Sequence, residues 1–130
     1  MKILQTLTRL YISREQLATS VKLYETQFQV KSSMHVTFPE VDLEAVQVGT
    51  LLLFAGPEHA LAAIKGTHVN VLVDSVKEWH DFLSQQQGII FLEEPHYAAT
   101  GWEMRVQNPD GVVFKYVEPS SGDGSFYQVV

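Results

Sequence analysis

The order of the predicted elements repeats once along the chain, and this repeat constrains the fold more than any other feature. A strand candidate at residues 7–12 precedes a helix candidate, and three short apolar strand candidates follow at residues 34–38, 44–48 and 51–54. The same β-α-β-β-β order starts again about 60 residues later. Two such halves predict an α+β fold, in which paired βαβββ modules form a curled mixed sheet around a cleft.

Each predicted helix carries a start signal and an apolar stripe. Ser13 and Ser75 each stand three residues before a Gln or a Glu, a spacing that is typical of a helix start. The stripe of the first helix consists of Leu17, Val21, Tyr24 and Phe28. The stripe of the second helix consists of Val76, Trp79, Phe82 and Leu83. Each helix is therefore expected to cover one face of its sheet, which leaves the other face to line the cleft.

The second half contains the clearest strand pattern. Residues 68–73 alternate strictly between the two faces, and further strand candidates lie at residues 89–92, 102–106 and 112–117. The segment Asn-Pro-Asp-Gly at residues 108–111 predicts a tight turn, because Pro presets φ and Gly accepts a positive φ. The last two strands are therefore expected to form a hairpin.

The sequence predicts a single domain over residues 1–121. Its halves span about residues 5–55 and 66–118, and the Ala-rich stretch between them predicts a linker with a short helical turn. Residues 122–130 form a C-terminal tail that ends in Phe-Tyr-Gln-Val-Val. Because this ending is too apolar to be left in water, we expect it to dock on its own domain or on a second subunit.

Composition and charge argue against several classes of function. Nine Lys and Arg against fifteen Asp and Glu give a formal charge of −6 at pH 7, which disfavours broad contact with nucleic acid or anionic membranes. No apolar run approaches the roughly 18 residues of a spanning helix. The chain has no Cys, and hence no disulfide and no thiolate ligand. We predict a cytoplasmic domain with no nucleic-acid partner and no membrane partner.

Two segments point to a known family. One is the strand-to-helix passage Thr-His-Val-Asn-Val-Leu-Val-Asp-Ser at residues 67–75, and the other is the ending Asn-Pro-Asp-Gly-Val-Val-Phe-Lys at residues 108–115. Together with the paired modules, they resemble the vicinal oxygen chelate superfamily, which includes glyoxalases, bleomycin-resistance proteins and dioxygenases. The resemblance covers roughly residues 5–118. It implies the paired-module fold and the family's usual homodimer or repeat-pair assembly, of which a homodimer is expected here.

The resemblance also places the family's four metal-ligand positions, which are usually a His and a Glu from each half. The His of the second half matches His68, and its first-half counterpart is Leu7. The Glu of the second half is replaced by Lys115, and the first-half carboxylate falls near Leu52 or Leu53. An ammonium group repels a divalent cation, and Leu offers it no donor atom. We therefore predict no bound metal and no cofactor.

The metal-free branch of the superfamily, which includes antibiotic-binding resistance proteins, is then the closer analogue. We predict metal-independent binding of a small molecule, such as an antibiotic or an aromatic metabolite, by a homodimer with no catalytic residues. One alternative is a metal-dependent lyase, isomerase or dioxygenase with a non-standard site around His68. Another is an interaction module whose cleft is filled by its own side chains or by the tail.

Two cations are predicted to anchor an anionic group of the ligand. Arg9 shares a strand face with Tyr11, and its planar guanidinium suits a carboxylate or a phosphate. Lys115 alternates with apolar neighbours and is expected to project into the cleft, unless it pairs with Glu103 across the hairpin. Arg9 at a strand edge is equally consistent with a solubilising role.

Four further residues are predicted to line the cleft: Tyr11, His68, Asn70 and Trp102. Trp102 is expected to stack on a flat ligand, with core packing or a dimer contact as the alternative. His68 and Asn70 are expected to form hydrogen bonds with the ligand, with a structural hydrogen bond as the alternative for His68. The segment Glu-Glu-Pro at residues 93–95 is expected to be a solvated loop. Surface positions are expected for most of the remaining histidines, His35, His59, His80 and His96.

Overall fold

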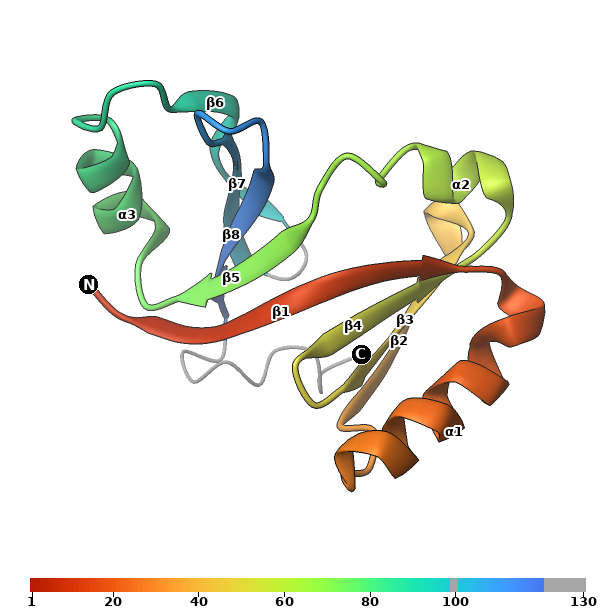
Figure 1. The fold of residues 1–130 in the computed structure, drawn as a ribbon. Coiled ribbons are helices and arrows are strands. Elements are labelled where there is room, and N and C mark those ends of the chain that lie inside the picture. The colour runs from red at the N-terminus through yellow and green to blue at the C-terminus, as the bar shows by residue number, and fades with distance from the viewer. Residues whose placement is uncertain (99–100, 121–130) are drawn as a thin grey trace. The chain divides into compact units, whose positions relative to one another are not determined.

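The computed structural model describes residues 1–98 and 101–120, and in this part of the chain the elements follow the repeated order (Figure 1). The first module consists of β1 (Ile3–Ile12), α1 (Leu17–Phe28), β2 (Met34–Phe38), β3 (Leu43–Val48) and β4 (Leu51–Ala55). The second consists of β5 (Val69–Val73), α3 (Val76–Leu83), β6 (Ile90–Ala98), β7 (Gly101–Gln107) and β8 (Val113–Pro119). Between them lies α2 (Glu58–Ala62), which confirms the helical turn expected in the linker.

The strands form one mixed, open sheet. Hydrogen-bonded neighbours follow the order β2-β3-β4-β1-β5-β8-β7-β6. Strand β1 is parallel to β4, and β5 is parallel to β8, while the neighbouring pairs within each meander are antiparallel. This arrangement confirms the α+β class and the paired βαβββ modules.

Residue contacts divide the described chain into two units. The N-terminal unit is Leu7–Gly66, and the C-terminal unit joins Met1–Thr6 to the described residues from Thr67 onward. Strand β1 thus contributes its first residues to one unit and its later residues to the other. In the N-terminal unit α1 packs on β3 and β4, and in the C-terminal unit α3 packs on β6, β7 and β8.

The start of α1 differs from the prediction. A short 3₁₀ turn at Arg14–Gln16 precedes the helix, and the backbone N–H of Gln16 donates to the carbonyl oxygen of Ser13 at 3.1 Å. The Ser13 side chain makes no capping hydrogen bond, so the predicted capping box is wrong. The apolar stripe nevertheless brings α1 onto its sheet, over a core of Leu17, Val46, Val48, Leu53 and Ala55.

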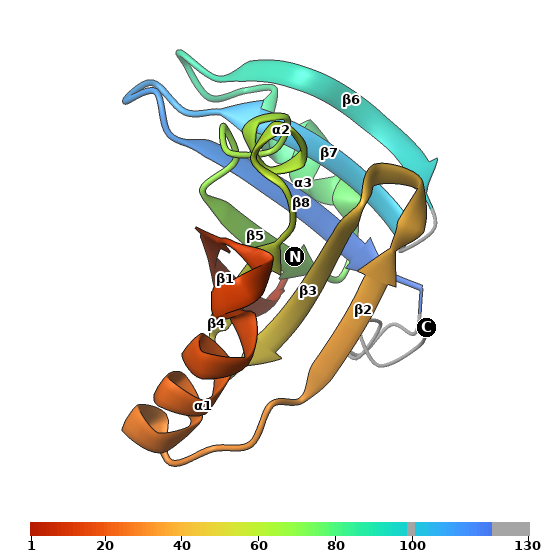
Figure 2. The same ribbon diagram turned by 90° about the vertical axis from the view of Figure 1, so that its right-hand side faces the viewer.

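The start of α3 confirms the prediction. Ser75 is the residue before the helix, and its Oγ accepts a hydrogen bond from the backbone N–H of Glu78 at 3.2 Å. Figure 2 shows β6, β7 and β8 side by side, with α3 behind them. Burial beneath this helix raises the pKa of Tyr116, so its hydroxyl stays neutral. The core under α3 consists of Val71, Val73, Val76, Leu83, Met104, Val106 and Tyr116.

Strand β6 is longer than the sequence predicted. It continues through Glu93, Glu94 and Pro95 as far as Ala98, so the loop expected at residues 93–95 is wrong, whereas the expected exposure of Glu93 and Glu94 is confirmed. Two register shifts interrupt its pairing with β7, between Phe91 and Glu93 and between Glu93 and His96. Because Pro95 has no N–H to donate, it is tolerated in a strand at the edge of the sheet.

The beginning of the chain is tied to the end of β5 through Asp74. The backbone N–H of Lys2 donates to Oδ1 of Asp74 at 2.9 Å, and this hydrogen bond holds the pKa of the carboxyl below its ordinary value. The contact stabilises the native state above the ordinary carboxyl pKa, and that contribution is lost as the pH falls through the lowered pKa.

The predicted tail at residues 122–130 lies outside the described residues. In the described part of the chain, no helix has both the length and the apolar character needed to cross a membrane.

Candidate functional site

The sheet of the C-terminal unit carries polar side chains on the face opposite α3. Side chains alternate along a strand, so Met104 and Val106 pack under the helix while Glu103 and Arg105 point to the other side. The register places Lys115 next to Arg105 on one side and next to Asn70 on the other. We call the set Asn70, Glu103, Arg105 and Lys115 the polar face.

Glu103 is the most buried charged residue of the polar face, with 8% of its surface exposed. The Nζ atom of Lys115 lies 3.3 Å from Oε1 of Glu103, and Nε2 of His96 lies 3.2 Å from the same oxygen. The pairing of Lys115 with Glu103, one of the two alternatives drawn from the sequence, is confirmed. A buried carboxylate needs such partners, because its desolvation otherwise costs several kcal/mol.

Arg105 is held in place by a second set of contacts. Its Nε lies 3.0 Å from Oε1 of Glu93, and its Nη1 donates a hydrogen bond to Oγ1 of Thr67 at 3.0 Å. The Thr67 side chain is buried, with 2% exposed, and this anchors one end of the guanidinium. The polar face therefore presents two cations whose side chains already have fixed partners.

His68 has the structural hydrogen bond that the sequence left as an alternative. Its Nδ1 accepts the backbone N–H of Val113 at 3.1 Å, so the ring proton of a neutral His68 is on Nε2. The residue lies just before β5 and is exposed. Only Nε2 therefore remains for a ligand. Asn70, by contrast, is 3% exposed and lies on the polar face opposite Lys115.

Arg9 and Tyr11 lie in the N-terminal unit and contact one another as well as sharing a strand face. Nη1 of Arg9 donates to the Tyr11 hydroxyl at 3.0 Å, and that hydroxyl donates to the carbonyl oxygen of Ile64 at 2.9 Å. The guanidinium carbon lies 4.6 Å from the centroid of the Phe54 ring, on which Tyr11 also stacks. The Arg9 guanidinium is thus half-buried and pre-positioned rather than a solvated surface charge.

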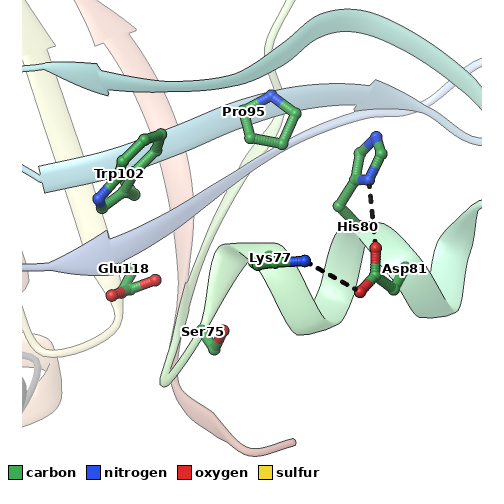
Figure 3. A pocket seen from close by; sticks show the side chains of 7 residues that line it. All are labelled: Ser75, Lys77, His80, Asp81, Pro95, Trp102 and Glu118. Carbon is green, nitrogen blue, oxygen red and sulfur yellow. Dashed lines mark ion pairs between the residues drawn. The ribbon is translucent and has the colours of Figure 1, made fainter.

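Trp102 is the predicted site residue that the structure places elsewhere. Side chains alternate along β7, so Trp102 lies on the same α3 side of the sheet as Met104 and Val106, and this corrects its expected position in the cleft. There it lines a pocket of about 490 Å³ (Figure 3). The other lining residues are Ser75, Lys77, His80, Asp81, Pro95 and Glu118.

Five residues of the polar face and its contacts are not among the predicted site residues: Glu103, Arg105, Glu93, His96 and Thr67. The sequence predicts a loop at Glu93 and surface positions for most of the histidines, His96 among them. The alternation of side chains along β7 could have identified Arg105, because Arg105 lies two residues after Glu103 and therefore on the same face. His96 reaches Glu103 across the irregular pairing of β6, and Thr67 lies outside any strand, so no periodic signal indicates either residue.

Comparison with known proteins supports the fold. No protein-family model and no curated protein sequence matches the chain. Among solved structures, an uncharacterized protein from Methanosarcina mazei is 36% identical, with a TM-score of 0.80 over 92% of this chain and 95% of that one. The chain belongs to the family of this protein.

More distant solved structures share the fold. Methylmalonyl-CoA epimerase from Mycobacterium tuberculosis is 13% identical, with a TM-score of 0.63 over 88% of this chain and 87% of that one. The Streptomyces coelicolor epimerase, in a complex with 2-nitronate-propionyl-CoA, is 12% identical, with a TM-score of 0.61 over 92% and 97%. Methylmalonyl-CoA epimerases have the vicinal oxygen chelate fold, and so does this chain.

The residues at the metal-ligand positions of the vicinal oxygen chelate fold do not suit a divalent cation in this chain. Leu7, Leu52 and Leu53 are fully buried and apolar, and the ammonium of Lys115 is beside Glu103. At His68 one ring nitrogen is already used by the backbone. Across residues 1–98 and 101–120, no group of three or more His, Cys, Asp or Glu side chains could hold a metal ion.

Proposed function

We propose that the protein binds a small organic molecule on the polar face without a metal, in the manner of drug-binding resistance proteins. The observation that supports this most is the carboxylate of Glu103, buried between Lys115 and His96 on the side of the sheet that α3 does not cover. Replacing a buried ion network with apolar packing is often neutral or stabilising, so the network is better explained by recognition than by stability.

The charges of the polar face favour a ligand with an anionic group. The side chains of Lys115 and Arg105 are 25% and 31% exposed, so both cations reach the surface despite their partners. Lys115 has three N–H donors, and the contact with Glu103 engages one of them. A carboxylate or phosphate of the ligand would receive donors from both cations, and Asn70 would add a neutral hydrogen bond.

The proposed ligand is an antibiotic or an aromatic metabolite that carries such an anionic group. In the N-terminal unit, Arg9 and Tyr11 offer a guanidinium and an aromatic ring for the same type of molecule. The homodimer implied by the superfamily resemblance is part of the proposal.

A thermal-shift screen tests this function. A panel of aromatic carboxylates, aromatic phosphates and bleomycin-type antibiotics is added to wild type, to Lys115→Met and to Lys65→Met. Lys65 is exposed and belongs to the N-terminal unit, so its variant controls for the loss of one positive charge. A compound that stabilises wild type should bind Lys115→Met about ten-fold more weakly, because one charge-assisted hydrogen bond is lost.

The compound should raise the melting temperature of Lys65→Met by as much as it raises that of wild type. Each shift is measured from the melting temperature of the same protein without the compound. The proposal is contradicted if no compound in the panel stabilises wild type, or if Lys115→Met responds as strongly as Lys65→Met.

A further inference from the structure

We propose a second ligand site, in which the pocket beside α3 binds an organic cation that carries an aromatic body. This pocket lies on the helix side of the C-terminal sheet, whereas the polar face lies on the opposite side. Its volume of about 490 Å³ is within the range of small-molecule sites. The proposal does not depend on the function proposed for the polar face.

The pocket exists because α3 leaves one row of the sheet uncovered. Tyr97, Trp102 and Glu118 are paired in register across β6, β7 and β8, so their side chains lie in a row on one face. The helix begins at Val76 and covers the next rows, in which Met104 is fully buried. In the uncovered row, by contrast, Trp102 is 45% exposed and Tyr97 is 65% exposed.

Trp102 supplies the surface that attracts a cation. The face of an indole ring is electron-rich and is the best side-chain partner for an ammonium group. Tyr97 packs edge-on against this ring at a centroid distance of 5.7 Å, which supports it in place. Pro95 adds apolar surface to the same wall of the pocket (Figure 3).

Glu118 supplies the negative charge. Its Oε1 accepts the backbone N–H of Val76 at 2.9 Å, which fixes the carboxylate at the start of α3. Within the described part of the chain, no residue donates a hydrogen bond to its Oε2. No described Lys, Arg or His forms an ion pair with either oxygen. The other lining carboxylate, Asp81, is 3.7 Å from the ammonium of Lys77. Glu118 is therefore the acid of this pocket that lacks a basic partner within the described residues.

The register of Trp102 with Glu118 brings these two features together. Figure 3 shows both side chains at the same end of the pocket, away from His80 and Asp81. An ammonium group placed there would contact the indole face and the carboxylate at once, while its aromatic body would lie against Pro95. The formal charge of −6 for the whole chain favours the approach of a cation over that of an anion.

Nuclear magnetic resonance with a defined probe tests this site. Benzyltrimethylammonium is titrated into the ¹⁵N-labelled full chain, which has two Trp side chains, and Trp102→Phe assigns the indole N–H signal of Trp102. We expect a saturable shift of this signal. Benzyl alcohol and phenylacetate, which have the ring without the cation, should shift it at least about five-fold less at equal concentration.

Matched variants distinguish binding of the probe at this site from a general attraction of the cationic probe to a negatively charged protein. Glu118→Gln keeps an oxygen to accept the Val76 N–H but removes the charge, and we expect it to weaken binding about five-fold. Trp102→Leu lacks this indole signal, so its binding is followed through the backbone amide signals of Val76 and Glu118, and we expect a similar or larger weakening. Glu40→Gln changes the net charge equally at an exposed position of the N-terminal unit and should leave the affinity unchanged.

The site is overturned by either of two results. One is a Trp102 signal that does not shift, or shifts without saturation, as the probe is added. The other is equal weakening by Glu118→Gln and Glu40→Gln, which would mean that the probe responds to net charge alone.

Discussion

Replacing Gly101 with alanine should destabilise the protein by about 3 kcal/mol or more. Gly101 has a φ of +126°, a conformation that L-residues rarely adopt. A β-carbon built there would overlap the carbonyl oxygen of Glu118 and would lie 3.1 Å from the backbone nitrogen of Ser120. Because these are backbone atoms, the clash is relieved only if β7 and β8 separate where Gly101 pairs with Pro119.

Urea unfolding of purified variants measures this effect, with Gly66→Ala as the matched control. At Gly66 no atom lies within 4 Å of the place that an alanine β-carbon would take, and φ is not positive. The control variant should therefore change the stability by less than about 0.5 kcal/mol. Equal stabilities of the two variants would contradict the close approach of β7 and β8 at Gly101.

Removing the ammonium of Lys115 should cost about 1–3 kcal/mol of stability. In Lys115→Met the Glu103 carboxylate keeps His96 but loses its nearest permanently charged neighbour. The cost is expected to be below that of breaking a fully buried pair, because the Lys115 side chain is 25% exposed. The double variant Lys115→Met with Glu103→Gln should recover at least about 1 kcal/mol, since it also removes the buried negative charge that Lys115 had balanced.

Lys77→Met is the control for this cycle. Lys77 also pairs with a carboxylate, that of Asp81, but its side chain is 86% exposed. Its loss should therefore cost less than about 0.5 kcal/mol. Equal effects of Lys77→Met and Lys115→Met, or a double variant less stable than Lys115→Met alone, would show that Lys115 does not stabilise a buried carboxylate.

The sequence predicted the fold well where the local pattern agrees with the final packing. Strict alternation from Val69 to Val73 and the capping serine at Ser75 predicted β5 and the start of α3, and both are confirmed. At Ser13 the same motif was misleading, because a 3₁₀ turn uses the serine carbonyl instead of its hydroxyl. The strand predicted at residues 89–92 is shorter than β6, because the irregular pairing of β6 breaks the alternation of side chains that marks a strand in a sequence.

The candidate site was predicted in part, and its errors have a physical cause. Alternation placed Asn70 and Lys115 on one face, and the register of β5 with β8 confirms it. The predicted cleft position of Trp102 is wrong because Trp102 lies two residues before Met104 on β7 and therefore shares the face that packs under α3. The contacts of Glu103 with His96 cross an irregular stretch of pairing, whose register depends on tertiary packing and not on a local pattern.

The shared fold does not transfer the chemistry of the epimerases to this chain. The similarity to methylmalonyl-CoA epimerases is 12–13% in identity, and a fold of this kind carries many functions. Three of the four positions that the family resemblance assigns to metal ligands carry Leu or Lys, and this supports the proposal of a metal-free site.

Metal content tests metal-independent binding most directly. The untagged protein is purified after growth with zinc, nickel, manganese and iron, and its metals are counted by elemental mass spectrometry. We expect less than about 0.1 equivalent of any divalent metal per chain, because a buried Leu7 and the ammonium of Lys115 occupy two of the positions that metal ligands would take. Near-stoichiometric metal that is lost in His68→Ala would contradict the metal-free site and would favour a metal-dependent enzyme.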